Sequence, residues 1–355
     1  MTKNKVTLLA LLAGSLLLSA CQGGGVLTSS WPGILVDGES VYVAFGQHVY
    51  SLQTANGQLR WQYPQEPDNG STFFAPPALT EDGQLIVAGY NGVVHSLDAA
   101  TGGENWRFAQ ARNRFISGPL AAASGLFVAN ADRFLYALDN AGNLGWSYQT
   151  EEPIWAAPVT DGSSLYVASM DHSLYALDPQ AGTLLWSVDL GTSLPNPPAF
   201  DADGRLYLGT FNGEVLALDS ANGGVLWRAS TQDWVWASPT VAEGVVYAGD
   251  ISGNLYAIDA ATGEVLWRAS AEGAVTGAPL LVGETVYFVA ETDGLIAIHA
   301  PDGVVSWREH PQFGRSFGPP VLAGDLVLIG VIDASAFLIA YDTNGVLVWE
   351  FSPAE

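Results

Sequence analysis

Lysine and cysteine are nearly absent from this sequence. Its 355 residues include one cysteine, Cys21, and two lysines, Lys3 and Lys5. One cysteine excludes an intrachain disulfide, so the stability of the fold must come from packing. Residues 21–355 contain 12 − 2 = 10 arginines against 36 acidic residues, a net charge of 10 − 36 = −26. This sign disfavours nucleic acid as a partner, because phosphate binding needs positive side chains, and it favours basic protein surfaces or cations.

Long apolar runs are also scarce, and the one that stands out lies at the N-terminus. It extends from Val6 to Leu18 after two lysines, a pattern typical of a secretory signal and too short to span a bilayer. The run leads into Leu18-Ser19-Ala20-Cys21, which resembles the lipobox of bacterial lipoproteins. The resemblance implies that residues 1–20 are a lipoprotein signal peptide and that Cys21 carries the lipid. Residues 21–30 would then be a lipidated tether, since acyl chains anchor a protein without a spanning segment.

Tryptophan, by contrast, recurs at a regular interval along the rest of the chain. The spacing is 40 to 45 residues, and the positions are Trp61, Trp106, Trp146, Trp186, Trp227, Trp267, Trp307 and Trp349. A fixed period of this length indicates a repeat architecture. One tryptophan per copy at a constant phase is what packing between copies requires, so we interpret this set as structural.

Each copy contains four short runs of β-branched and aromatic residues, which predict strands. In the sixth copy they are 238–241, 245–248, 254–258 and 265–269. Short turns with Asp and Gly join them, and six aspartates recur at one turn position: Asp98, Asp139, Asp178, Asp219, Asp259 and Asp342. Asp can hydrogen-bond the turn backbone while Gly takes the left-handed conformation. Each copy is therefore predicted to be a four-stranded antiparallel meander.

Proline opens the first strand of every copy, at Pro32, Pro76, Pro119, Pro158, Pro197, Pro239, Pro279 and Pro319. Because proline cannot donate to a sheet ladder, it belongs at an edge or a strand start. The first strand of each copy should therefore border a central channel, and the repeated tryptophan should lie on the outermost strand. The predicted fold for residues 31–355 is all-β, an eight-bladed β-propeller of four-stranded antiparallel blades.

The run from Leu255 to Trp267, Leu-Tyr-Ala-Ile-Asp-Ala-Ala-Thr-Gly-Glu-Val-Leu-Trp, resembles the PQQ-type propeller repeat. The quinoprotein-like family with this repeat includes quinoprotein dehydrogenases and the BamB lipoprotein of the outer-membrane barrel-assembly machinery. The resemblance covers about residues 31 to 354 and implies the propeller fold. It does not imply one activity, because enzymes and scaffolds share the repeat.

Catalytic and metal-binding patterns are weak. The five histidines show no metal-ligand spacing, and no Gly-rich phosphate motif or nucleophile elbow stands in its proper context. The resemblance to quinoprotein dehydrogenases implies PQQ beneath a disulfide of adjacent cysteines, with bound calcium. With one cysteine in the chain, we expect neither a cofactor nor catalytic residues.

The loops between blades, and those between the second and third strands, should emerge together on one face. They vary in sequence, and variable loops on a rigid scaffold commonly carry function. Four aromatic residues fall there at steps of 81 residues, two repeats: Phe74, Trp155, Trp236 and Phe317; Trp234 lies beside them. They predict either a collar that grips a peptide, sugar or planar ligand, or rings that fill gaps between blades.

Arginines on the same face form a second candidate set. Arg112, Arg114 and Arg315 lie on its loops, and Arg133 lies on a strand-connecting loop beside them. Two aromatic residues are close to these arginines in the sequence: Phe115 follows Arg114, and Phe313 precedes Arg315 by two positions. This composition is typical of hot spots for protein recognition. The alternative is that these arginines are local counter-charges for an acidic surface.

Three functions remain open from the sequence. The first is an extracytoplasmic, lipid-anchored scaffold similar to BamB, which binds an envelope protein such as the barrel-assembly machinery. The second is a carbohydrate- or peptide-binding propeller, and the third is a PQQ-dependent oxidoreductase. Gln22 follows the lipidated cysteine; it is not the Asp that retains many lipoproteins in the inner membrane. This favours the outer membrane in a bacterium with two membranes, and otherwise the outer face of the cell membrane.

Overall fold

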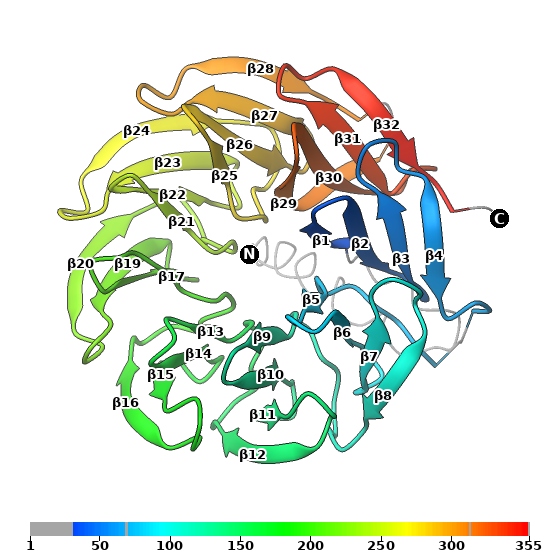
Figure 1. Cartoon of the computed structure of the whole chain (residues 1–355). Helices are drawn as coiled ribbons and strands as arrows, with labels where there is room; N and C mark the ends of the chain where they lie inside the picture. The colour runs from blue at the N-terminus through cyan, green and yellow to red at the C-terminus, as the bar shows by residue number, and fades with distance from the viewer. Residues whose placement is uncertain (1–30, 68–69, 312–313, 354–355) are drawn as a thin grey trace, which may run out of the picture. The chain divides into compact units, whose positions relative to one another are not determined.

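Eight four-stranded sheets are arranged radially around a common centre (Figure 1). The computed structural model describes residues 31–67, 70–311 and 314–353. Every sheet consists of four strands consecutive in the sequence, and all neighbouring strands are antiparallel. The described residues form no helix that could cross a membrane. The predicted eight-bladed β-propeller of antiparallel meanders is confirmed.

The strands divide among the eight blades in chain order. Blades 1 to 4 consist of β1 Gly33–Asp37, β2 Ser40–Phe45, β3 His48–Gln53, β4 Leu59–Tyr63; β5 Ala78–Leu79, β6 Gln84–Ala88, β7 Val94–Asp98, β8 Glu104–Phe108; β9 Leu120–Ala122, β10 Gly125–Ala129, β11 Phe134–Leu138, β12 Leu144–Gln149; β13 Val159–Thr160, β14 Leu165–Ala168, β15 Ser173–Leu177 and β16 Leu184–Asp189. Blades 5 to 8 consist of β17 Ala199–Phe200, β18 Arg205–Gly209, β19 Glu214–Asp219, β20 Val225–Ser230; β21 Thr240–Ala242, β22 Val245–Gly249, β23 Asn254–Asp259, β24 Val265–Ser270; β25 Leu280–Val282, β26 Thr285–Ala290, β27 Gly294–His299, β28 Val305–Glu309; β29 Arg315–Ala323, β30 Leu326–Ile332, β31 Leu338–Asp342 and β32 Leu347–Phe351.

The first strand of each blade lies nearest the centre of the ring and the fourth lies at the rim (Figure 1). In seven blades a proline directly precedes the first strand, as Pro239 precedes β21. In the eighth, Pro319 and Pro320 lie inside β29, where the pairing with β30 shifts register. The missing N–H of proline is thus confined to a strand start or an irregular edge, as predicted.

Buried apolar residues gather in eight clusters, and each cluster joins two neighbouring blades. The repeated tryptophan, on the fourth strand, stands opposite a small residue of the third, as Trp267 stands opposite Ala257. In every blade the ladder shifts register immediately after that small residue. A small partner gives the large indole room to lie over the adjacent blade.

Each indole meets a left-handed glycine in the turn of the next blade. Trp227, for example, lies against Gly263, whose φ is +77°, and an added Cβ there would come within 2.8 Å of the ring. The Trp227 indole N–H also donates to the carbonyl oxygen of Ala260, at 3.0 Å. Only glycine accepts both this backbone conformation and this close approach. The structural interpretation of the repeated tryptophans is confirmed.

The ring closes without exchange of a strand, because the last four strands form a blade by themselves. The Trp349 indole N–H donates to the carbonyl oxygen of Thr54 in blade 1, at 3.0 Å. Trp31 stacks on Phe317, with the ring centroids 6.0 Å apart. The closing junction therefore has the same indole hydrogen bond as five other junctions, with one added aromatic stack.

The recurrent turn aspartates accept hydrogen bonds within their own turns. Asp98 accepts from the hydroxyl and the backbone N–H of Thr101, at 2.7 and 2.8 Å, and Asp259 does the same with Thr262. These bonds lower the pKa of both carboxyl groups below their usual range. The bonds favour the charged form, and they confirm the turn role predicted for these aspartates. The predicted signal peptide, Cys21 and the tether lie outside the described residues.

Candidate functional site

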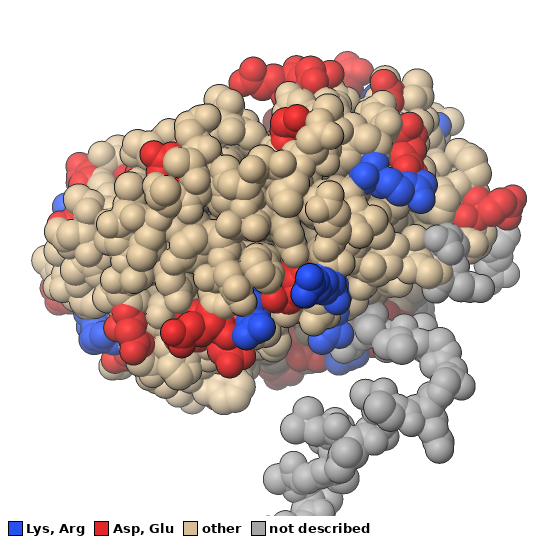
Figure 2. Space-filling model, turned by 90° about the horizontal axis from the view of Figure 1, so that it is seen from below, with Lys and Arg blue, Asp and Glu red and all other residues tan. Residues whose placement is uncertain are grey.

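The propeller has two faces of different character. One, the loop face, carries the connections between blades and the loops between second and third strands; the other, the turn face, carries the remaining short turns. Figure 2 shows acidic side chains along the upper and lower edges, while the few basic side chains mostly lie beside acidic ones. The loop face contains most of the residues that the sequence singles out.

A buried residue anchors nearly every connection between blades, a feature that the sequence interpretation missed. The anchors are fully buried and consist of Phe73, Phe115, Ile154, Leu194, Val235 and Val275. The backbone N–H of Val235, for example, donates to the carbonyl oxygen of Thr210 in the preceding blade, at 3.0 Å. An apolar residue every 39 to 42 positions was the signal that could have found them.

The four predicted collar residues each follow directly after an anchor position. Phe74 is buried and packs edge-on against Phe45 and Tyr90, at centroid distances of 6.2 and 5.2 Å. Trp155, Trp236 and Phe317 are only partly buried. Phe74 therefore fills a gap between rings, whereas Trp155, Trp236 and Phe317 keep part of their surface exposed.

Three aromatic rings gather where blades 5 and 6 meet. Phe211, from the β18–β19 loop, lies 5.3 Å from Trp234 and 5.4 Å from Trp236, measured between ring centroids. Trp234 is 49% exposed, which is unusual for so large a ring. We call these three residues the aromatic cluster. It offers a partner a rigid apolar surface with indole N–H groups that can donate hydrogen bonds.

Adjacent residues of this connection should differ sharply in their effect on stability. Val235→Ala is expected to lower the free energy of unfolding by about 1–3 kcal/mol, because a buried anchor leaves a cavity. Trp234→Ala should change it by less than about 0.5 kcal/mol, since the ring is half exposed. Urea unfolding of both variants tests this. Equal losses would mean that Trp234 is itself a packing residue.

Arg112 and Arg114 lie in the connection between blades 2 and 3, and Arg133 lies in the β10–β11 loop of blade 3, where its guanidinium donates to the carbonyl oxygen of Glu151 at 3.4 Å. Arg112, Arg114 and Arg133 are exposed, and none has a carboxylate within 4 Å among the described residues. The Arg114 guanidinium lies 5.6 Å from the centre of the Tyr90 ring, a cation–π contact. Burial raises the pKa of Tyr90, and the Arg114 charge acts in the opposite direction. We call Arg112, Arg114 and Arg133 the arginine patch.

Asp132 holds this patch in place without neutralising it. Its carboxylate accepts from the backbone N–H of Arg112 at 2.8 Å and from the Tyr136 hydroxyl at 2.7 Å. Burial and the neighbouring Asp132 raise the pKa of Tyr136, so its proton stays in this bond. Arg133 adopts a left-handed φ of 77°. The backbone is thus held in place, while none of the three guanidinium groups is paired with a carboxylate among the described residues.

The other predicted residues behave differently. Arg315 pairs with Glu291 at 2.9 Å and Asp333 at 2.8 Å and lies over Phe317. Those two carboxylates raise the pKa of Arg315, so it serves as a counter-charge. Phe115 is fully buried as an anchor, and its contribution is packing. Phe313 lies outside the described residues.

Two aromatic residues of the loop face were missed at the sequence level. Tyr90 and Phe211 occupy the same loop position in blades 2 and 5, and each precedes Asn-Gly. That shared tripeptide pattern was the available signal. Among residues 31–67, 70–311 and 314–353, no three His, Cys, Asp or Glu side chains gather in a group that could hold a metal ion. The arrangement of exposed aromatic and arginine side chains on the loop face can bind another surface.

Known proteins resemble this chain over most of its length. A family model described as outer membrane protein assembly factor BamB matches residues 71–170, 170–251 and 212–354. The crystal structure of BamB from Moraxella catarrhalis has a TM-score of 0.72 at 18% identity, covering 86% of this chain and 92% of that one. The computationally designed Ika8 protein has a TM-score of 0.75 at 15% identity, covering 88% and 96%. No curated protein sequence matches.

Proposed function

Because this chain belongs to the family of the outer membrane protein assembly factor BamB, we propose that it is a scaffold lipoprotein that assists outer-membrane protein assembly. The match of that family model across residues 71–354 carries the proposal. The chain would be held at the periplasmic face of the outer membrane by lipid on Cys21. Residues 22–30 can extend about 30 Å at most, which keeps the propeller near the membrane.

The loop face is the surface we assign to partner binding. It combines the aromatic cluster with the arginine patch, and both residue types are enriched at interface hot spots. The chain is strongly acidic, and these three guanidinium groups have no carboxylate within 4 Å among the described residues, so they can attract an acidic partner. Acidic or aromatic segments of an envelope protein would complement these two surfaces, and charge complementarity would speed their encounter.

Cross-linking in native membranes tests the proposal. Amine-reactive reagents have no lysine target beyond Lys5, so a photo-reactive amino acid at Asn113 or Gln232 is the suitable probe. Both positions are exposed and adjoin the arginine patch and the aromatic cluster respectively. A matched probe at Leu266, which is 52% exposed on the outer strand β24, controls for random contact.

Capture of one fixed outer-membrane assembly component from the two loop-face positions, and not from Leu266, is the expected result. Capture at equal yield from all three positions would contradict the assigned surface. Unchanged outer-membrane protein content after deletion of the gene would contradict the assembly role itself.

A further inference from the structure

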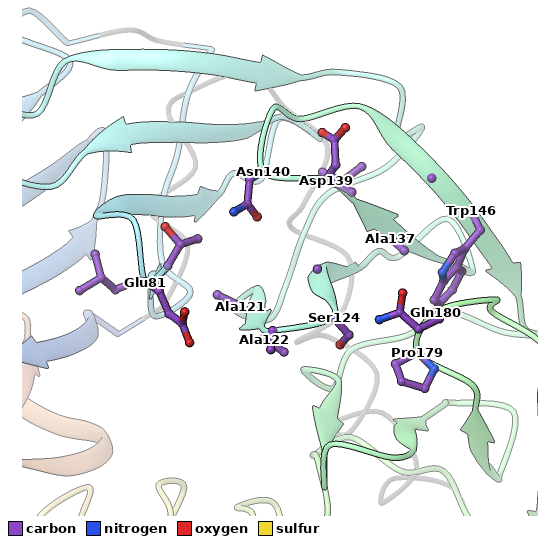
Figure 3. A pocket seen from close by; sticks show the side chains of 16 residues that line it. Glu81, Ala121, Ala122, Ser124, Ala137, Asp139, Asn140, Trp146, Pro179 and Gln180 are labelled. Carbon is purple, nitrogen blue, oxygen red and sulfur yellow. The ribbon is translucent and has the colours of Figure 1, made fainter.

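A cavity of about 440 Å³ opens on the turn face around the β9–β10 turn of blade 3. It lies opposite the face assigned to partner binding and is independent of that proposal. Trp146, Pro179 and Gln180 lie on one side of the turn that carries Ser124, and Glu81 lies on the other (Figure 3). The volume falls in the range of about 300–1,000 Å³ found for small-molecule sites.

The cavity forms where blade 3 departs from the repeat. Its first turn reads Ala122-Ala123-Ser124-Gly125 and contains no acidic residue. The first turn of every other blade contains at least one, at Asp37, Glu81, Asp161, Asp201, Glu243, Glu284 and Asp325. Small neutral side chains thus replace the acidic residue in the first turn of blade 3 and leave a hollow.

The indole N–H that forms a hydrogen bond across six of the blade junctions is unused at this one. Six of the repeated indoles donate to a backbone carbonyl of the next blade, as Trp186 donates to Ser220 at 3.0 Å. Trp146 makes no such bond within the described part of the chain, and the equivalent carbonyl belongs to Pro179. Trp307 also lacks this bond, but there the Tyr287 hydroxyl donates to the equivalent carbonyl, that of Thr343, at 3.2 Å.

Two departures from the repeat accompany the missing Trp146 bond. Phe127 pairs with Trp146 where five other blades place a tyrosine, so no hydroxyl from this position can reach the next blade. Pro179 stands where Ala260 in blade 6 donates its N–H to Gly244, at 2.9 Å. Proline has no N–H and cannot form that bond. The hydroxyl is therefore missing from the junction of blades 3 and 4, and the turn bond is missing within blade 4.

From these observations we propose that the cavity is a binding site for a neutral, hydroxyl-rich small molecule of saccharide size. The Trp146 indole N–H, the Ser124 hydroxyl and the Gln180 amide line it, and their side chains form no hydrogen bond to described residues. Sugar hydroxyls both donate and accept, which suits this mixed set. Ala122 and Pro179 supply apolar surface for the C–H groups of a sugar ring.

The charges around the cavity argue for a neutral ligand. Acidic turns on the neighbouring blades repel anions. A cation would need converging carboxylates, but Asp139 is occupied by the backbone N–H groups of Ala141 and Asn143, at 2.9 and 2.8 Å. Glu81 lies across the turn from Trp146 (Figure 3).

Titration of the full-length protein, labelled with ¹⁵N at the indole nitrogens, tests this site. The probes are glucose, N-acetylglucosamine and maltose at millimolar concentrations, with glucose 6-phosphate as the anionic comparison. The Trp146 resonance should shift with a neutral sugar, while the indoles bonded across blades stay in place. Trp146→Phe keeps an aromatic ring, although a smaller one, and removes the N–H, so the affinity should fall about tenfold, equivalent to 1.4 kcal/mol.

Two further variants keep the test decisive. Ser124→Trp fills the cavity from an exposed turn and should abolish binding. Trp186→Phe removes an indole N–H that is already bonded to Ser220, and its sugar affinity should match that of the unmodified protein. No movement of the Trp146 resonance with any of the three neutral sugars would overturn the proposal, as would equal loss of affinity in Trp186→Phe.

Discussion

Gly263→Ala is expected to lower the free energy of unfolding by about 2–5 kcal/mol, whereas Gly244→Ala should lower it by only about 1–2 kcal/mol. The two glycines have nearly the same backbone conformation, with φ of +77° and +78°. Alanine in this left-handed region costs about 1–2 kcal/mol wherever it stands. Both substitutions therefore carry the cost of the left-handed backbone conformation, and only Gly263→Ala adds a steric cost.

The difference arises from the indole of the preceding blade. A Cβ at Gly263 would lie 2.8 Å from Trp227, while nothing lies within 4 Å of a Cβ at Gly244. Overpacking of this kind adds about 1–3 kcal/mol, because the indole must move away from its carbonyl partner, Ala260. Comparison of the two urea unfolding curves measures how much the close packing of the Trp227 indole against Gly263 contributes to the free energy of unfolding. Equal losses at the two sites would show that the indole adjusts without cost.

Charge reversal of the arginine patch is expected to weaken partner binding by about tenfold to a hundredfold. The variant combines Arg112→Glu, Arg114→Glu and Arg133→Glu, and the prediction rests on the proposed scaffold function. Each exposed charge pair contributes up to about 1 kcal/mol, and reversal also introduces repulsion from an acidic partner. The affinity of the unmodified protein should fall with added salt, and the variant should lose most of that dependence.

Arg268→Glu is the matched control for this variant. Arg268 is exposed on β24 and likewise has no carboxylate within 4 Å among the described residues, but it lies away from the patch. It should leave partner binding unchanged. The thermal unfolding temperature should differ little between the two variants, because none of these arginines holds the fold through an ion pair. A similar loss of binding in Arg268→Glu would mean that the net charge of the protein, and not the arginine patch, controls partner binding.

The repeat made the scaffold highly predictable. In the sixth copy the expected strands at 245–248, 254–258 and 265–269 correspond to Val245–Gly249, Asn254–Asp259 and Val265–Ser270. Strand, turn and tryptophan positions depend on short-range preferences that recur in every copy. Eight copies repeat the same information, so a weak signal in one blade is supported by its neighbours.

Individual residues of the candidate site were less predictable. The 81-residue step selected Phe74, which is buried, and Phe115 was grouped with arginines although it is an anchor. Neighbouring positions in an extended connection point in opposite directions, and a period of two repeats does not say which direction faces inward. The ion-pair partners of Arg315 are Glu291 and Asp333. They lie 24 and 18 residues away in the chain, so the sequence pattern around Arg315 does not identify them.

The sequence by itself determined the number of blades, the order of strands and the packing role of the repeated tryptophan. These properties follow from local pattern, because a blade is built from residues close together in the chain. Only the tertiary structure decided which guanidinium groups stay unpaired and that Phe127, Ser124 and Pro179 meet around one unbonded indole. Those residues belong to different strands and blades, and their departures from the repeat acquire meaning only when the ring brings them together.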